Sequence, residues 1–117
     1  MDERRQLPRW KVNKEVKVWM QENQDSTTCV IEDLHLKGMC VSFKNRLPQE
    51  ESVKMSFAIG DHSDPIKIEA QVPWSKEDQG RYVYGLSFNK INETDKDRLS
   101  QYIIVNCYDQ FRSKWWA

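Results

Sequence analysis

The 117-residue sequence has no excess of charge of either sign and no long apolar run. Its 18 basic and 18 acidic residues balance, so it is not the globally basic chain that is typical of general nucleic-acid binding. No N-terminal stretch resembles a signal peptide, and no run is long enough to cross a bilayer. We therefore expect a cytoplasmic protein without membrane insertion, and its length fits one domain with one core.

The sequence also lacks the patterns that carry metal or catalytic chemistry. Its three cysteines form no C-x-x-C pair and give no zinc pattern with the two histidines, His35 and His62. There is no Gly-rich phosphate loop, and neither histidine has a partner pattern for nucleophilic catalysis. We expect reduced thiols, no metal or cofactor, and no enzymatic activity.

What the chain does have is alternation of apolar and polar residues, separated by turn-forming residues. The segments that read as strands are residues 15–20, 27–33, 39–43, 52–59, 66–74 and 81–88, with residues 75–80 as a polar hairpin loop. Six such strands must bury one face, and a closed barrel does so while removing exposed strand edges. We predict a mainly β fold, a six-stranded antiparallel β-barrel.

The period changes near the C-terminus, where apolar residues recur every four positions. This stripe predicts a C-terminal α-helix over about residues 93–115 that packs on one mouth or side of the barrel, through Leu99, Ile103, Cys107, Phe111 and Trp115. Asn92 or Thr94 can cap its start.

We expect residues 1–13 to form a flexible basic leader, and residues 14–117 to form the barrel with its helix. Over residues 1–14 five basic residues face two acidic ones, a local charge of +3. Arg5 and Arg9 carry planar guanidinium groups that suit phosphate oxygens and the Hoogsteen edge of guanine, with flat faces that stack on a base. Taken alone, the leader is more simply a solvated basic tail.

A second polar motif, Asp33 to Gly38, separates the second and third predicted strands. The Asp33 carboxylate matches the N1–H and N2–H₂ donors of guanine, and His35 points to the same side if the segment is extended. Gly38 permits a tight turn or the close approach of a ligand. Each motif alone occurs by chance, but together they favour one site that binds guanine and anions.

This combination resembles the PilZ domain, the small bacterial receptor module for cyclic di-GMP, over nearly the whole chain from about Arg4. The family's R-x-x-x-R signature is matched by Arg5 and Arg9. Its D/N-x-S-x-x-G signature is matched by Asp33 and Gly38, with His35 where serine is usual. Residues 83–88 are similar to the family's G-x-x-F strand, and residues 72–74 to its valine–tryptophan ending.

The resemblance implies that the leader wraps over a six-stranded barrel to clamp cyclic di-GMP, without a cofactor. Arg5 and Arg9 would hold phosphates and guanine, and Asp33 a guanine edge, while Arg4 lies where the family associates arginine with an intercalated ligand dimer. The implied ligand-binding residues are Arg4, Arg5, Arg9, Asp33, His35 and Gly38. The implied role is second-messenger signalling to an unidentified effector protein, in motility or biofilm regulation.

Two alternatives stay open at this point. Imidazole is larger than a serine hydroxyl, so His35 can crowd the pocket, and the chain would then be a ligand-free adaptor with Trp115 and Trp116 as a contact patch. Single-stranded nucleic-acid binding draws support from the tryptophans and tyrosines. The zero net charge and the lack of a basic strand face oppose it.

Overall fold

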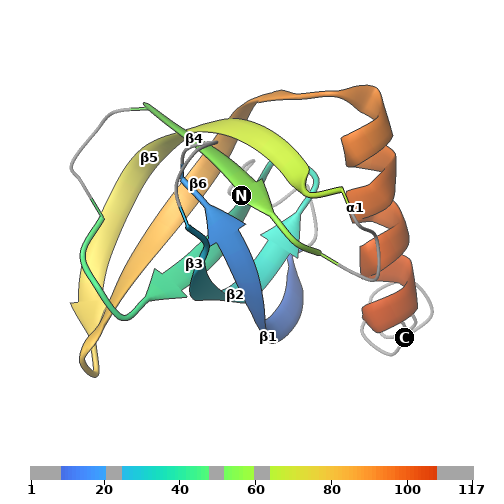
Figure 1. Ribbon diagram of the computed structural model, residues 1–117. Coiled ribbons are helices and arrows are strands. Elements are labelled where there is room, and N and C mark those ends of the chain that lie inside the picture. Colours follow the sequence, from blue (N-terminus) through green and yellow to red (C-terminus); the bar gives the residue numbers. More distant parts are fainter. Residues whose placement is uncertain (1–8, 21–24, 48–51, 60–63, 108–117) are drawn as a thin grey trace, which may run out of the picture.

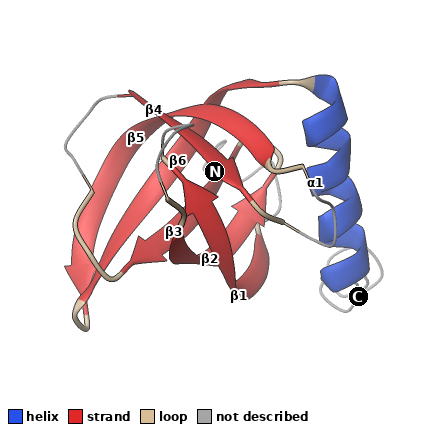
Figure 2. Ribbon diagram, viewed as in Figure 1, coloured by secondary structure: helices blue, strands red, loops and turns tan. Residues whose placement is uncertain are grey.

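The computed structural model describes residues 9–20, 25–47, 52–59 and 64–107. These residues form six strands followed by one helix (Figure 1): β1 (Trp10–Trp19), β2 (Thr27–His35), β3 (Gly38–Phe43), β4 (Ser52–Phe57), β5 (Ile66–Asp78), β6 (Arg81–Ile91) and α1 (Glu93–Asn106). Figure 2 shows the strands wrapped around a common interior, with α1 standing against one side of them.

The strands close into an antiparallel barrel in the order β1-β2-β3-β6-β5-β4. The seam between β1 and β4 is short, because only Val18 pairs with Phe57 and Trp19 with Ser56. The predicted mainly β fold, a six-stranded antiparallel barrel with a C-terminal helix, is confirmed. No helix of the described residues is long and apolar enough to span a membrane.

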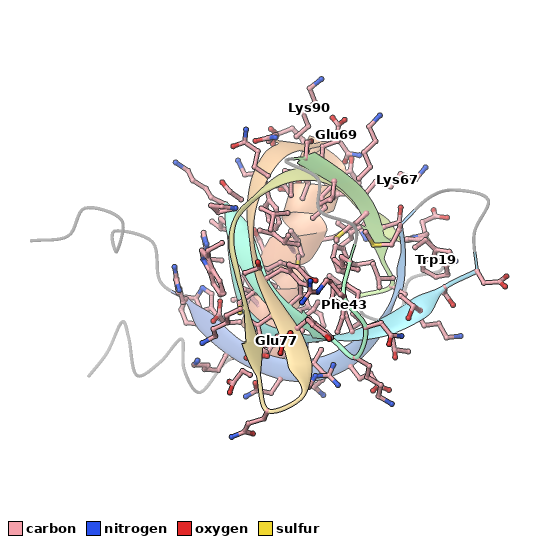
Figure 3. All side chains as sticks on the ribbon, turned by 90° about the vertical axis from the view of Figure 1, so that its left-hand side faces the viewer. Trp19, Phe43, Lys67, Glu69, Glu77 and Lys90 are labelled. Carbon is pink, nitrogen blue, oxygen red and sulfur yellow. The ribbon has the colours of Figure 1, made fainter. Side chains whose placement is uncertain are left out.

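The barrel interior is filled by the apolar half of each alternating strand. Cross-strand partners share a face, so Val41 of β3 meets Ile31 of β2 on one side and Tyr84 of β6 on the other. The rings of Phe43 and Tyr84 meet edge to face with centroids 6.0 Å apart, and Figure 3 shows Phe43 pointing into the barrel. Burial of this apolar surface is the main favourable term for folding.

Helix α1 is joined to β5 through the carboxylate of Asp95, which is 7% exposed. Asn92 is the N-cap, since its Oδ1 accepts from the Asp95 N–H at 2.8 Å. One carboxylate oxygen of Asp95 accepts from the Lys67 N–H of β5 at 3.1 Å. The other accepts from Arg98 Nη1 at 3.2 Å. The helix ends at Asn106, and the predicted continuation beyond residue 107 lies outside the described residues.

Two strand boundaries differ from the sequence prediction by four residues or more. β1 begins at Trp10, so residues 10–13 of the predicted leader belong to the barrel. The register of β1 is irregular between Lys11 and Lys14, where Asn13 has a φ of 52°. The start of this strand therefore does not show the regular alternation of apolar and polar residues. The predicted loop 75–80 is wrong, because β5 continues to Asp78.

The β5–β6 turn contains only Gln79 and Gly80, with φ values of 51° and 79°. Two successive positive φ values are typical of a type I′ hairpin turn, which fits the twist of the flanking strands. Residues 73–78 are all exposed. They therefore lack the alternation of buried and exposed residues from which a strand is predicted.

Replacing Asp95 with alanine should lower the free energy of unfolding by about 2–3 kcal/mol, because the N–H of Lys67 and the guanidinium of Arg98 lose their acceptor. Urea unfolding measures this change. Asp97→Ala, an exposed position on the same helix, is the matched control and should have little effect. Equal losses in the two variants would show that Asp95 does not join the helix to the barrel.

Candidate ligand-binding site

One row of residues crosses five strands on the outside of the barrel. Asp33 of β2 pairs with Lys11 of β1 and Cys40 of β3, and Cys40 pairs with Gly85 of β6, which pairs with Trp74 of β5. Their neighbours along these strands face the core, so this row faces outward.

A second row on the same outer face contains His35, Gly38, Ser87 and Gln71, from β2, β3, β6 and β5. The sequence-predicted residues Asp33, His35 and Gly38 therefore lie together. They share the outer face with Trp74, Cys40 and Ser87, which the site prediction did not include.

Asp33 reaches the outer face because β2 contains one extra residue. Ile31 pairs with Val41 and Asp33 with Cys40, so the residue between them, Glu32, has no partner on β3. Ile31 is fully buried in the core, and plain alternation would turn Asp33 inward as well. A β-bulge of this kind reorients the residue that follows it, and here it places a carboxylate on the outer face.

Trp74 is turned outward in the same way. Gln71 pairs with Ser87 and Trp74 with Gly85, so β5 has one residue more than β6 in this interval. Pro73 lies in this irregular stretch, where its missing N–H costs no ladder hydrogen bond. The apolar alternation of residues 66–74 had placed Trp74 on the buried face, whereas its side chain is 42% exposed.

The Asp33 carboxylate is nearly buried but has no partner among the described residues. The residue is 9% exposed, and its side chain makes no hydrogen bond or ion pair with the described part of the chain. Among the described residues, Arg98 Nε is the one fully buried side-chain atom without a partner. The Asp33 oxygens therefore keep some contact with solvent, where a donor from outside can reach them.

His35 is held in one orientation by its own turn. Its Nδ1 accepts from the Lys37 N–H at 3.2 Å, so the neutral ring carries its proton on Nε2. Burial lowers the pKa of the His35 imidazole below its ordinary value, and the Arg9 and Lys37 cations act in the same direction while the Asp33 carboxylate opposes them. His35 is therefore a neutral donor near pH 7.

Glycine is required at the two floor positions by close packing rather than by a turn. A Cβ on Gly38 would lie 2.3 Å from the Leu86 carbonyl oxygen and 3.1 Å from His35 Nε2. One on Gly85 would lie 2.2 Å from Trp74 Nε1. Gly38 closes the two-residue turn of Leu36 and Lys37 by pairing with His35, and it does so without a positive φ. The absent side chains let the Trp74 indole pack on Gly85 and the His35 imidazole pack on Gly38. These two rings, with Cys40, form the outer surface here, which we call the floor.

Cations lie near this floor. Arg9 precedes β1 and is exposed, and its charge acts on both His35 and Cys40. Burial, with the Asp33 and Glu32 carboxylates, raises the pKa of the Cys40 thiol to about 11, against the opposing effect of Lys76 and Arg9. Cys40 therefore stays a neutral thiol, a small surface rather than a nucleophile.

Two of the predicted site residues, Arg4 and Arg5, lie outside the described residues. Within the described ranges, no group of three or more His, Cys, Asp or Glu side chains is placed to hold a metal ion. The arrangement supplies hydrogen-bond groups, one aromatic face and positive charge around the floor. Such a set can bind a planar, anionic ligand.

The model of the PilZ domain family matches residues 3–104 of the chain. The chain belongs to the PilZ domain family. The resemblance predicted from the two signatures is thereby confirmed, since the match spans both. No curated protein sequence matches the chain.

Solved structures share the fold of this PilZ domain at low sequence identity. The inhibitor of motility MotI/DgrA from Bacillus subtilis superposes with a TM-score of 0.69 at 20% identity, over 97% of this chain and 54% of that one. The PilZ domain of YcgR from Escherichia coli, solved with c-di-GMP, has a TM-score of 0.66 at 18% identity, over 96% and 97% of the two chains. The present chain thus spans about half the length of MotI/DgrA.

Gly38→Ala in this PilZ domain should lower the free energy of unfolding by about 1–3 kcal/mol, because the added methyl group meets the Leu86 backbone oxygen, which cannot move aside. Gly85→Ala should cost less, since the exposed Trp74 indole can swing away. Urea unfolding, with tryptophan emission as a second signal, compares the two. A larger loss for Gly85→Ala would contradict the packing described for both glycines.

The His35 imidazole should titrate below its ordinary pKa of about 6.5. Because folding favours the neutral ring, its contribution to stability is complete above that ordinary pKa and is lost as the pH falls through the folded pKa. An NMR titration of the His35 Cε1–H gives the pKa, and urea unfolding across this range gives the stability. His35→Gln should remove that part of the pH dependence. A pKa above the ordinary value would contradict the assigned orientation of the ring.

Proposed function

We propose that this PilZ domain is a non-enzymatic receptor for cyclic di-GMP, and that binding orders its N-terminal residues for recognition by a partner protein. The observation that carries the proposal is the nearly buried carboxylate of Asp33, which has no hydrogen-bond or ion-pair partner among the described residues, on the same outer face as His35 and Trp74 and near the Arg9 cation. Membership in the PilZ family supports it. So does the YcgR PilZ domain, a fold relative that was solved with this ligand.

Asp33 supplies the specificity for guanine in this proposal. A carboxylate accepts from N1–H and N2–H₂ together, a pair of adjacent donors that adenine does not offer. Burial strengthens the selection, because a desolvated carboxylate facing the wrong base edge is left without hydrogen bonds. The base would lie beside Cys40 and against the Trp74 ring, which covers Gly85.

His35 takes the place of the serine that is usual in this signature. Its Nε2 carries the proton and lies over Gly38, so the ring offers one donor in a fixed direction. A phosphate oxygen or a guanine acceptor can receive it. The charge of the ligand is matched by Arg9, and by Arg4 and Arg5 in the N-terminal residues, whose guanidinium forks suit phosphate oxygens.

A second candidate function follows from the position of the His35 imidazole. His35 Nε2 is 3.1 Å from the position of a Gly38 Cβ, so the imidazole covers Gly38. If it blocks the ligand, the domain is a ligand-free adaptor that contacts other proteins. Calorimetry with cyclic di-GMP separates the two functions, because an adaptor gives no binding heat at about 50 µM ligand.

Cyclic di-GMP should bind the full chain by isothermal titration calorimetry, and Asp33→Asn and Arg9→Ala should each weaken binding by about 10–100-fold. The reason is that each removes a charged hydrogen-bond partner of the ligand. Arg9→Lys, which keeps the charge but loses the planar fork, should also weaken it.

The control is Lys14→Ala, an exposed lysine of β1 away from the floor. It should bind as the unchanged chain does, and Arg9→Ala should keep the unfolding midpoint of the unchanged chain. Full affinity in Asp33→Asn would refute the proposed role of this carboxylate. An absence of binding heat for the unchanged chain would refute the receptor function.

A further inference from the structure

A second recess lies outside the row of site residues. The lysine groove, as we call it, is a recess of about 1540 Å³ lined by β4, β5, the end of β6 and the start of α1, with residues from the end of β1 and the β2–β3 turn. Small-molecule pockets occupy roughly 300–1,000 Å³. The lysine groove is larger, so its size fits a segment of a macromolecule better than a single metabolite.

Its rim is strongly positive in a chain that is neutral overall. Five lysines and two glutamates line it, a local excess of three positive charges in a chain of net charge zero: Lys37, Lys54, Lys67, Lys90 and Lys96 with Glu69 and Glu93. Glu69 lies between two of the lysines, 3.5 Å from Lys54 and 3.9 Å from Lys90. Figure 3 shows Lys67, Glu69 and Lys90 projecting outward from the same side of the barrel.

The floor of the lysine groove has an apolar part. It consists of the partly exposed side chains of Phe88, Ile91 and Leu36, since Met55 and Ile68, which also line the groove, belong to the barrel core and are only 2% and 3% exposed. Leu36 is 37% exposed. A partly apolar floor inside a ring of cations matches an occupant with apolar side chains along one face and carboxylates beside them.

We propose that the lysine groove is a docking site for an acidic, amphipathic segment of a partner protein. Charge complementarity and the apolar part of the floor favour this occupant over nucleic acid. No arginine lines the groove, although arginine is the residue best suited to phosphate, and two glutamates would repel a phosphate backbone.

The groove adjoins the candidate nucleotide site through the β2–β3 turn. Leu36 and Lys37 line the groove, while His35 and Gly38, at the two ends of the turn, belong to the site. The turn is fixed to β6, because Phe88 N–H donates to the Lys37 carbonyl at 2.9 Å. A partner bound in the groove would therefore contact the same turn whose two ends belong to the site. Only this coupling rests on the proposed function; the docking itself does not need the nucleotide.

The test is an NMR titration of the ¹⁵N-labelled full chain, without nucleotide, with a synthetic helical peptide of about 16 residues that has leucines on one face and glutamates beside them. The largest amide shifts should fall on Lys67, Phe88 and Lys90. A second peptide, with glutamine at every glutamate, should bind about tenfold more weakly, and raising the ionic strength should weaken the first.

A triple variant of groove lysines, Lys67→Gln, Lys90→Gln and Lys96→Gln, should weaken peptide binding by about tenfold. The matched control is the triple variant Lys14→Gln, Lys17→Gln and Lys44→Gln, with exposed lysines outside the groove, and it should bind within about twofold of the unchanged chain. Because all six lysines are exposed, both variants should fold.

Four binding results would overturn the proposal. These are no shifts at millimolar peptide, shifts on another face, equal losses in the two triple variants, and tighter binding of a single-stranded oligonucleotide than of the peptide. Nuclear Overhauser contacts between residues 1–8 and the groove in the free chain would also overturn it, because the occupant would then be the chain itself. Repeating the titration with cyclic di-GMP tests the coupling separately.

Discussion

The candidate site depends on two extra residues in the strand ladders of the barrel. Without Glu32 in β2, the Asp33 carboxylate would face the apolar interior, where an unpaired charge costs several kcal/mol. Without the irregular pairing at Pro73 in β5, the Trp74 ring would face inward instead of covering Gly85. Bulges next to functional sites are a recurrent way to reorient a side chain while the rest of the sheet keeps its register.

These two irregularities bring the groups of the proposed site to the outer face of the barrel. Between them lie Gly38, Cys40 and Gly85, and the two glycines let the His35 and Trp74 rings pack closely on the strands. Asp33 has little exposed surface and no hydrogen-bond partner among the described residues. In the proposed complex a ligand donor would supply this partner to a carboxylate whose position the fold already fixes. The same β2–β3 turn borders the lysine groove, which places the two sites side by side.

The sequence predicted the barrel, the number of strands and the position of the helix start, because each depends on apolar periodicity or a cap that is visible in a short window. It also placed Asp33, His35 and Gly38 together, because they lie in one short segment of the sequence. It did not predict that Trp74 faces outward, since an irregular pairing changes the face of the sheet on which a residue lies without changing its neighbours in the sequence. The two-residue turn at Gln79 was missed because polar residues flank it on both faces.

The most direct test of this account is the structure of the domain bound to cyclic di-GMP. The account predicts that one guanine lies beside Cys40 and the Trp74 ring and that its N1 and N2 atoms are about 2.8–3.0 Å from the Asp33 carboxylate oxygens, with the pairing of β2 and β3 around Glu32 unchanged. A ligand bound away from the outer face of β2, β3 and β6, or a guanine edge held by other residues while Asp33 stays unpartnered, would contradict it.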